Sequence, residues 1–292
     1  MNRLAFWRRA LAWAGCAFAG GMLLVAGLLK ALDPAGFATQ IRADVPWLAG
    51  LAGPLSVAGI AIEVVLGSAL ILGFRRRFLV GTAMLMVLVF IGVTIPKLGS
   101  TDPAACGCFG NFVVRTPGQV IGEDLVMLVA LLVGLTGGSG SAWSAWRRGV
   151  LVIAAGIGLA LPLAAPALPL DNVATRLKPG ASLADLQLDE AVPDLATGHH
   201  FVILSGQSLD TCADVPESLF EFTEAHADDR FWLVKPSDVL ARDGTLSLCV
   251  PGAEIVEVPA AGLRPLYRTL PRSFEMVDGI VTRTFEGYPA GS

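Results

Sequence analysis

The sequence predicts an α-helical integral membrane bundle with five transmembrane helices, followed by a soluble α/β domain. Hydrophobic residues make up 54% of the 292 residues and charged residues only 16%, against about a quarter charged in soluble domains. The balance of charge also reverses along the chain. Residues 1–170 hold 12 Lys and Arg against 6 Asp and Glu, whereas residues 171–292 hold 9 against 19. The first part therefore belongs in a membrane and the second in water.

Five apolar stretches approach or exceed the roughly 20 residues that cross a bilayer as a helix. They are residues 10–29, 45–74, 78–96, 118–136 and 149–170. We expect a four-helix membrane domain over residues 1–136, a linker with the fifth span over 137–170, and the soluble domain over 171–292.

Arginines predict the orientation of the spans. They cluster before the first span, between the second and third, and before the fifth, within residues 3–9, 75–77 and 147–148. Because Lys and Arg resist translocation, these segments should be cytoplasmic. The N-terminus then lies in the cytoplasm of a bacterial cell, while the loop after the third span and the C-terminal domain lie in the periplasm, where thiol pairs oxidise.

The soluble part reads as alternating strands and helices, which is typical of a small α/β fold. Strands are expected at 200–204, 230–235, 246–250, 254–258, 274–277 and 280–285, and helices at 212–227 and 263–269. The last two strands flank Asp278-Gly279, a strong hairpin signal. The acidic tail has no basic patch with interleaved aromatics, so a nucleic-acid partner is not expected. No His or Cys spacing indicates a metal site, including His199-His200 at the head of a strand.

Two cysteines stand in the loop between the third and fourth spans, in the segment Cys106-Gly107-Cys108-Phe109-Gly110. A disulfide across one glycine closes a small, strained ring, and strain makes such a bond a good oxidant. Lys97 and Arg115 are the nearby cations that could favour a thiolate. A redox-active pair is favoured over a purely structural disulfide.

The membrane half resembles the MauE family, the methylamine-utilisation membrane proteins related to the DoxX group. The matching residues are Lys30-Ala-Leu-Asp33-Pro34 with Phe37, Glu63 with Gly67, and the Cys106–Gly110 segment. The resemblance covers roughly residues 10–136. It implies a four-helix membrane core associated with disulfide formation, which in methylamine users serves the disulfide-rich small subunit of methylamine dehydrogenase. It also implies a separate thioredoxin-like partner protein.

The tail resembles a degenerate thioredoxin-like domain. Phe201–Leu204 matches the strand before the active site, Cys212 the second active-site cysteine, and Pro271 the cis-proline. Leu209 stands where the first cysteine of a working Cys-x-x-Cys site would be. Two interpretations of Cys212 stay open. A thiolate at a helix N-terminus would accept a mixed disulfide from Cys106 or Cys108, or Cys212 pairs with Cys249 in a structural bridge.

Acidic residues within the spans have several interpretations. Glu63 is a candidate catalytic residue, because a charge in the membrane is costly and often functional. It could relay protons to a quinone-like acceptor, bond across helices, or pair with Lys30 or Lys97. We expect Glu123 and Asp124 to complement the dipole at the start of their helix. Asp33 and Asp44 are expected in a solvated exterior loop.

These observations favour a membrane thiol-disulfide oxidoreductase or maturation protein. Its predicted catalytic residues are Cys106, Cys108, Cys212 and Glu63, and a membrane quinone is the candidate cofactor. The expected partners are the lipid bilayer and an exported cysteine-containing client. The alternative is a non-enzymatic membrane scaffold whose thioredoxin-like tail binds a client or assembly partner.

Overall fold

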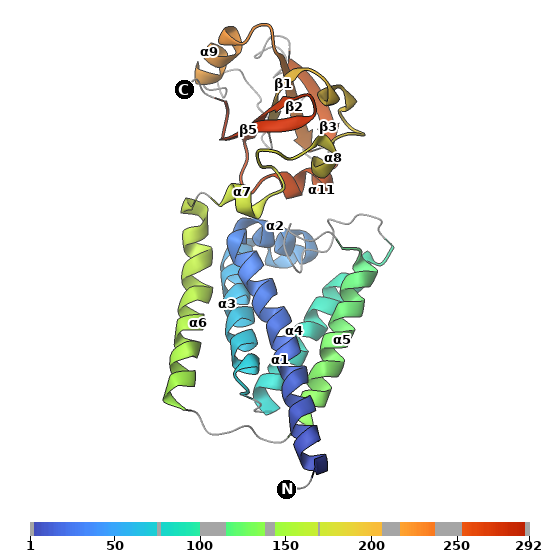
Figure 1. The fold of residues 1–292 in the computed structure, drawn as a ribbon, viewed down its shortest axis with the longest axis vertical. Coiled ribbons are helices and arrows are strands. Elements are labelled where there is room, and N and C mark those ends of the chain that lie inside the picture. The colour runs from blue at the N-terminus through green and yellow to red at the C-terminus, as the bar shows by residue number, and fades with distance from the viewer. Residues whose placement is uncertain are drawn as a thin grey trace. The chain divides into compact units, whose positions relative to one another are not determined.

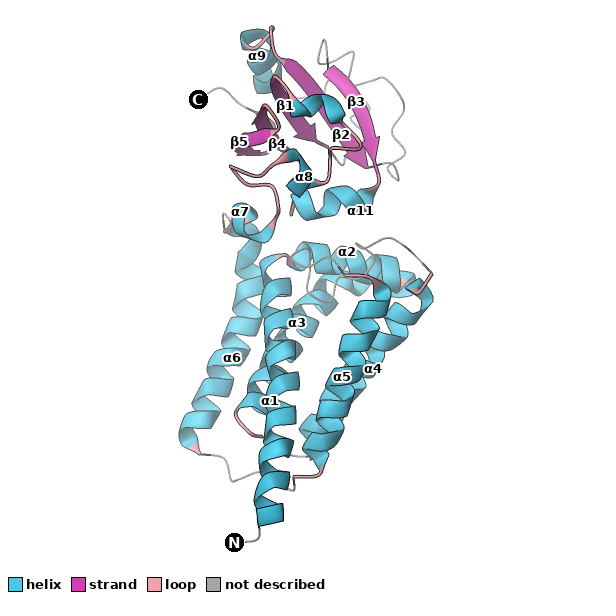
Figure 2. Cartoon of the chain, turned by 45° about the vertical axis from the view of Figure 1, so that its right-hand side comes forward, coloured by secondary structure: helices cyan, strands magenta, loops and turns pink. Residues whose placement is uncertain are grey.

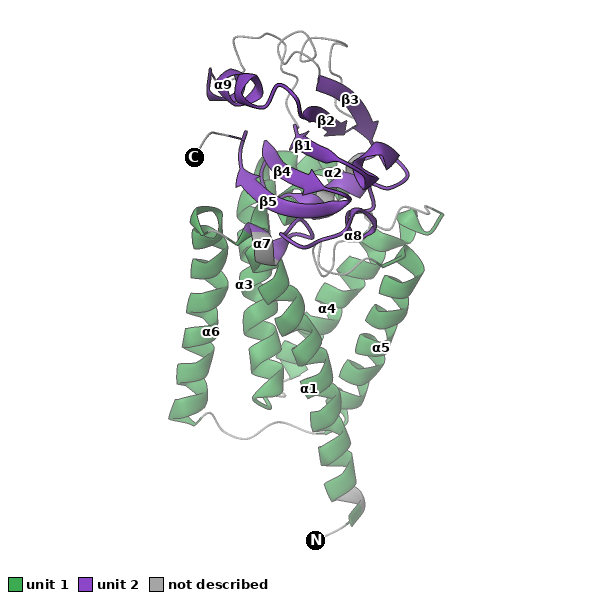
Figure 3. Cartoon of the chain, turned by 45° about the horizontal axis from the view of Figure 1, so that its top comes forward, with its two compact units in different colours: residues 1–170 green, residues 171–292 purple. Residues whose placement is uncertain are grey.

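The computed structural model describes residues 3–74, 77–99, 115–137, 144–168, 170–205, 217–236 and 253–289. The chain divides into two compact units, residues 1–170 and residues 171–292, which Figure 3 colours separately. The first unit is helical and the second contains a sheet, so the predicted succession of a helical bundle and an α/β domain is confirmed.

The predicted five membrane spans are confirmed. Five helices of the described part are long and apolar enough to cross a bilayer. They are α1 (Arg3–Leu32), α3 (Ala52–Ile71), α4 (Arg77–Thr94), α5 (Pro117–Leu135) and α6 (Ala145–Ala164), and Figure 1 shows them running along a common direction. A further helix, α2 (Pro34–Asp44), lies across one end of this bundle. The N-terminal ends of α1, α4 and α6 and the C-terminal ends of α3 and α5 lie at the opposite end (Figure 1).

Polar side chains set the starts of two helices. Thr116 caps α5 by accepting from the backbone N–H of Gln119, whose side chain accepts from the N–H of Thr116 in return. Such a reciprocal box satisfies two helix-terminal donors that would otherwise lack partners. Asp33 caps α2 in a similar way and accepts from the N–H of Gly36 at 2.9 Å.

The prediction of a solvated loop at Asp33 and Asp44 was therefore wrong. Asp33 is 5% exposed and Asp44 ends α2, where its carboxylate pairs with Lys97 at 2.6 Å. The segment is helical because Pro34 at the first helical position fixes a helix-compatible φ and follows a capping side chain.

Glycines allow α1 and α3 to cross closely. A Cβ on Gly67 would lie 2.6 Å from the carbonyl oxygen of Gly20, and one on Gly20 would lie 2.7 Å from the carbonyl oxygen of Gly67. No side chain fits at either position without movement of backbone. Helices in membranes associate through such small residues, because lipid tails offer no hydrophobic driving force between them.

The C-terminal unit is built on a five-stranded mixed sheet, shown as magenta arrows in Figure 2. The strands are β1 (His199–Leu204), β2 (Arg230–Pro236), β3 (Ala253–Val258), β4 (Arg272–Val277) and β5 (Ile280–Glu286), in the spatial order β3-β2-β1-β4-β5. Strands β1, β2 and β3 are parallel, while β4 and β5 form an antiparallel hairpin. The hairpin turn at Asp278-Gly279 was predicted, and both residues have positive φ, as a two-residue hairpin loop requires.

Helix predictions in this unit were less accurate. Helix α9 (Glu217–Ala225) lies inside the predicted 212–227 range. The helix expected at 263–269 is displaced toward the N-terminus, into α11 (Ala260–Leu263) and a 3-10 turn, η8 (Arg264–Leu266). Pro265 explains the shift, because its ring disfavours the α-helical conformation of the preceding residue, Arg264. The strand predicted at 246–250 lies outside the described residues.

The segment before β1 forms part of the domain core. A short helix, α7 (Asp171–Ala174), is followed by α8 (Leu183–Leu186), which Ser182 caps. The side chains of Leu177, Leu186 and Leu195 are fully or almost fully buried against strand residues such as Phe274. Residues 171–198 are therefore an integral part of the α/β fold.

Candidate functional site

The three predicted catalytic cysteines, Cys106, Cys108 and Cys212, lie outside the described residues. The loop that holds the first two joins two described ends. On one side the 3-10 helix η2 (Ile95–Lys97) extends α4, and on the other Arg115 precedes α5. The fourth predicted residue, Glu63, is described, and it lies at the centre of a charged cluster inside the bundle.

Glu63 and Lys30 form an ion pair buried within the membrane-spanning helices. Lys30 Nζ donates to Glu63 Oε1 at 2.5 Å, and the two side chains are 2% and 0% exposed. Of the partners considered from sequence, Lys30 is the correct one, because Lys97 pairs with Asp44 instead. Gly27 allows the close approach, since a Cβ there would lie 2.9 Å from the Cβ of Glu63.

Two aromatic rings complete the surroundings of the Lys30 ammonium. Its Nζ lies 4.8 Å from the ring centroid of Phe37 on α2 and 4.7 Å from that of Phe90 on α4. A ring face attracts a cation, and the attraction grows to about 2 kcal/mol where water is excluded. The ammonium is therefore held by one carboxylate and two aromatic faces.

A third ionisable residue, Asp124 on α5, belongs to the same region. It is 6% exposed, and its Oδ2 has no hydrogen-bond partner among the described residues. Helix α5 packs against α1, the helix that carries Lys30. The interpretation of Asp124 as a partner of the helix dipole does not hold, because Asp124 lies beyond the first turn of α5, where that effect fades. Its neighbour Glu123 turns outward and pairs with Arg115 at 2.5 Å.

The cluster draws one side chain from each of the elements α1 to α5: Lys30, Phe37, Glu63, Phe90 and Asp124. Sequence reasoning missed the roles of Phe90 and Asp124. The available signal was that Lys30, Glu63 and Asp124 are ionisable residues within apolar membrane spans, where such residues usually face the bundle interior and one another.

Lys97 and Arg115, the cations proposed to favour a thiolate in the loop, each have a carboxylate partner. Lys97 pairs with Asp44, and Arg115 with Glu123. Their positive charges are thereby largely compensated within the described part of the chain. The ion pairs anchor both ends of the loop to α2 and α5.

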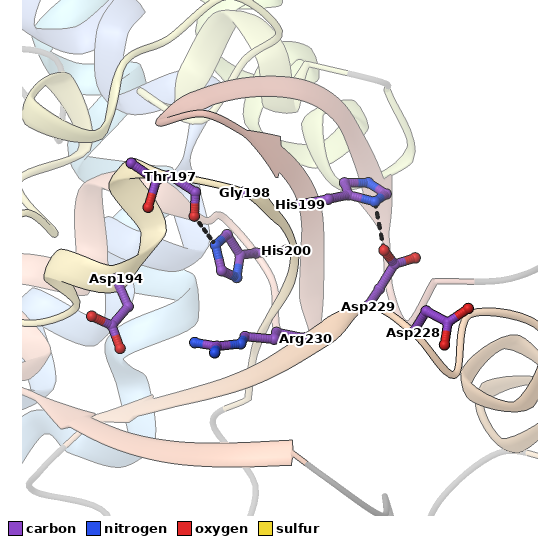
Figure 4. Close-up of a pocket in the computed structure, with 8 residues that line it drawn as sticks. All are labelled: Asp194, Thr197, Gly198, His199, His200, Asp228, Asp229 and Arg230. Carbon is purple, nitrogen blue, oxygen red and sulfur yellow. Dashed lines mark hydrogen bonds and ion pairs between the residues drawn. The ribbon is translucent and has the colours of Figure 1, made fainter.

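The α/β unit holds a separate open pocket of about 420 Å³. Figure 4 shows its lining residues: Asp194, Thr197, Gly198, His199, His200, Asp228, Asp229 and Arg230. His200 is buried and accepts from Trp232 Nε1–H at its Nδ1, while its Nε2 bonds to the carbonyl of Thr197 at 2.8 Å. Both of its ring nitrogens are thus occupied by protein partners, and no group of three His, Cys, Asp or Glu side chains in the described residues is arranged to hold a metal.

His199 lies between two carboxylates. Its Nδ1 is 2.8 Å from Asp229 Oδ1 and its Nε2 is 2.7 Å from Glu275 Oε1. Burial alone would lower the pKa of His199, but the hydrogen bonds to Glu275 and Asp229 outweigh it and raise the pKa. This geometry ties β1 to β4 and to the residue before β2, and it suits a structural bridge better than a catalytic base.

Comparison with known proteins supports an assignment for the membrane half. The family model described as methylamine utilisation protein MauE matches residues 8–161, which is more than half of the chain and includes all five cluster residues. No curated protein and no solved structure matched the chain. With five apolar spans in the described residues and this family match, the chain is a multi-pass membrane protein that belongs to the MauE family of methylamine utilisation proteins.

Proposed function

We propose that the protein is a membrane thiol-disulfide redox protein that supports disulfide formation in an exported client. The observation that carries the proposal is the Cys106-Gly107-Cys108 segment, which joins two spans of a MauE-family protein. Family membership supports a role in methylamine utilisation, so the small subunit of methylamine dehydrogenase is the first client to test. The arginine distribution supports a cytoplasmic N-terminus and a periplasmic location for the loop and the α/β domain.

The proposed reaction is thiol-disulfide exchange. A client thiolate attacks the Cys106–Cys108 disulfide, and a second client thiol resolves the mixed disulfide. Two client thiols lose two electrons and two protons in total, and the Cys106 and Cys108 thiols are formed. A membrane quinone is the proposed oxidant that restores the disulfide and becomes a quinol.

The order of elements in the α/β domain also supports the proposal. Its central strand β1 is followed by the segment with Cys212, and a cis-proline at Leu270–Pro271 precedes β4. This order suits a thioredoxin-like domain, in which Cys212 would carry a mixed disulfide toward the membrane pair. Leu209 in place of a first cysteine excludes an internal dithiol in that motif.

A test replaces Cys106 and Cys108 with Ser and counts free thiols in the exported client by alkylation. The fraction of oxidised client should fall sharply in the double variant. Cys16→Ala is the matched control, because Cys16 is buried in an apolar cluster with side chains of α1, α3, α4 and α5. An oxidised fraction that is the same in both variants would exclude the redox function.

The second candidate function is a non-enzymatic assembly factor, and Leu209 is the observation that favours it. In that case Cys106→Ser and Cys212→Ser retain client maturation, whereas deletion of residues 171–292 abolishes it. The same client assay separates the two functions.

A further inference from the structure

The buried cluster of Lys30, Glu63 and Asp124 contains more acidic than basic side chains. It contains two carboxyl groups and one ammonium, and all three residues are 6% exposed or less. If all three were ionised, one net negative charge would remain inside the bundle. An uncompensated charge in a medium that excludes water is so costly that such a group binds a proton instead.

The other charged groups around Asp124 do not remove this excess. Helix α1 contributes Lys30, whose hydrogen bond goes to Glu63. Residues 78–94 of α4 contain no charged side chain, and the following Lys97 pairs with Asp44. On α5 itself the neighbouring charge is Glu123, which pairs with Arg115 and adds negative potential. No further cation among the described residues is left to compensate Asp124.

Two buried carboxyl oxygens without hydrogen-bond partners among the described residues also indicate that one acid of the cluster binds a proton. Oδ2 of Asp124 and Oε2 of Glu63 are both buried without a hydrogen-bond partner in the described part of the chain. Glu63 already accepts a charged hydrogen bond at Oε1, so it is the ionised acid of the two. Oδ2 of Asp124 has no such donor among the described residues, and one added proton would neutralise this carboxyl group.

We propose that Asp124 binds one exchangeable proton inside the membrane bundle, beside the Lys30–Glu63 ion pair. The cluster then holds a neutral acid, an ionised acid and an ammonium, and its net charge is zero. This inference depends on the membrane cluster alone, and it would stand even if the proposed thiol chemistry failed.

Infrared spectroscopy of the purified full-length protein tests the proposal. The protonated carboxyl group has a C=O stretch at higher frequency than the amide and carboxylate bands. A maltoside detergent keeps the region clear, because it has no carbonyl group. At neutral pH the wild-type minus Asp124→Asn difference spectrum should contain one carboxylic-acid band, and transfer to D2O should shift it to lower frequency.

Two further variants make the charge count testable. Glu123→Gln is the matched control, since it alters the adjacent but ion-paired acid, and it should leave the band unchanged. Lys30→Met removes the only cation of the cluster, so both acids should take protons and the band should grow roughly twofold. Far-UV circular dichroism checks that each variant keeps its helices, and the nearly isosteric Asp124→Asn variant is sufficient on its own to test the proposal.

Three results would overturn the proposal. The difference spectrum between wild type and Asp124→Asn could lack the band, which would show that Asp124 is ionised. The band could persist in Asp124→Asn and vanish in Glu63→Gln, which would place the proton on Glu63. A band that never shifts in D2O would show a proton that does not exchange.

Discussion

The Lys30–Glu63 ion pair should show strong energetic coupling. Replacing either residue with Met leaves the other ionisable group buried without its partner, whereas the double variant Lys30→Met/Glu63→Met leaves two apolar side chains of similar size. Breaking a buried pair costs about 3–5 kcal/mol in soluble proteins, while joint apolar replacement is close to neutral. The structure favours a value at or below the lower limit, because Glu63 can take a proton when Lys30 is replaced and Asp124 can pair with Lys30 when Glu63 is replaced.

We therefore expect each single variant to lose about 2–3 kcal/mol of unfolding free energy and the double variant less than about 1 kcal/mol. The assay is reversible unfolding in mixed micelles by added SDS, followed through the helical circular dichroism signal. The partly exposed Lys97–Asp44 pair, with side chains 21% and 9% exposed, supplies a control cycle whose coupling should stay below about 1 kcal/mol.

Additive losses would refute this reasoning. If the double variant loses the sum of the two single losses within about 0.5 kcal/mol, the groups do not interact. The short Nζ–Oε1 contact would then contribute nothing to the stability of the bundle.

Three further predictions concern packing, pH and the tail. Gly67→Ala should cost about 1–3 kcal/mol in the same SDS assay because its Cβ would meet α1 backbone, whereas Gly81→Ala, which faces open space, should not destabilise. For His199 the pKa is raised in the folded state, so its stabilising contribution is fully present below the unfolded pKa of about 6.5 and is lost as pH rises through the folded pKa. In urea unfolding of the tail, the unfolding free energy of wild type should therefore exceed that of His199→Gln at acidic pH only. The difference should stay below about 1 kcal/mol because the site is partly exposed. An equal difference at alkaline pH would contradict this. Arg272→Met should destabilise the tail by about 2–3 kcal/mol, because Asp171, 2.8 Å from Arg272, would keep only the more distant Arg268 as a described partner. Replacing the exposed Lys178 with Met should change the stability by less than about 0.5 kcal/mol. Similar losses in both variants would exclude a special role for Arg272.

Sequence reasoning succeeded where one physical signal dominates. The five spans follow from apolar runs that nothing else explains, and the β4–β5 hairpin follows from Asp278-Gly279, whose positive φ values few other residue pairs tolerate. The parallel strands β1 and β2 follow from short apolar runs of the right length. In each case the local sequence determines the element.

Features that depend on contacts between distant residues could not be predicted in the same way. The partner of Glu63 was one of several candidates, because the sequence does not show which helices the glycine contacts bring together. Asp124 and Glu123 are adjacent and chemically similar, yet one faces the bundle interior and the other pairs with Arg115. Only the rotation of α5 within the bundle distinguishes them.

Because each of the helices α1 to α5 supplies one member of the cluster, the net charge of the buried cluster changes as the chain is synthesised. A nascent chain that ends before α5 carries Lys30 and Glu63, which balance each other. Insertion of α5 then brings an acid with no counterion, so its entry into the bilayer beside α1 should be slower at alkaline than at acidic pH. With Asp124 protonated as proposed, we therefore expect a late, pH-sensitive step in the assembly of the bundle, at the insertion of α5.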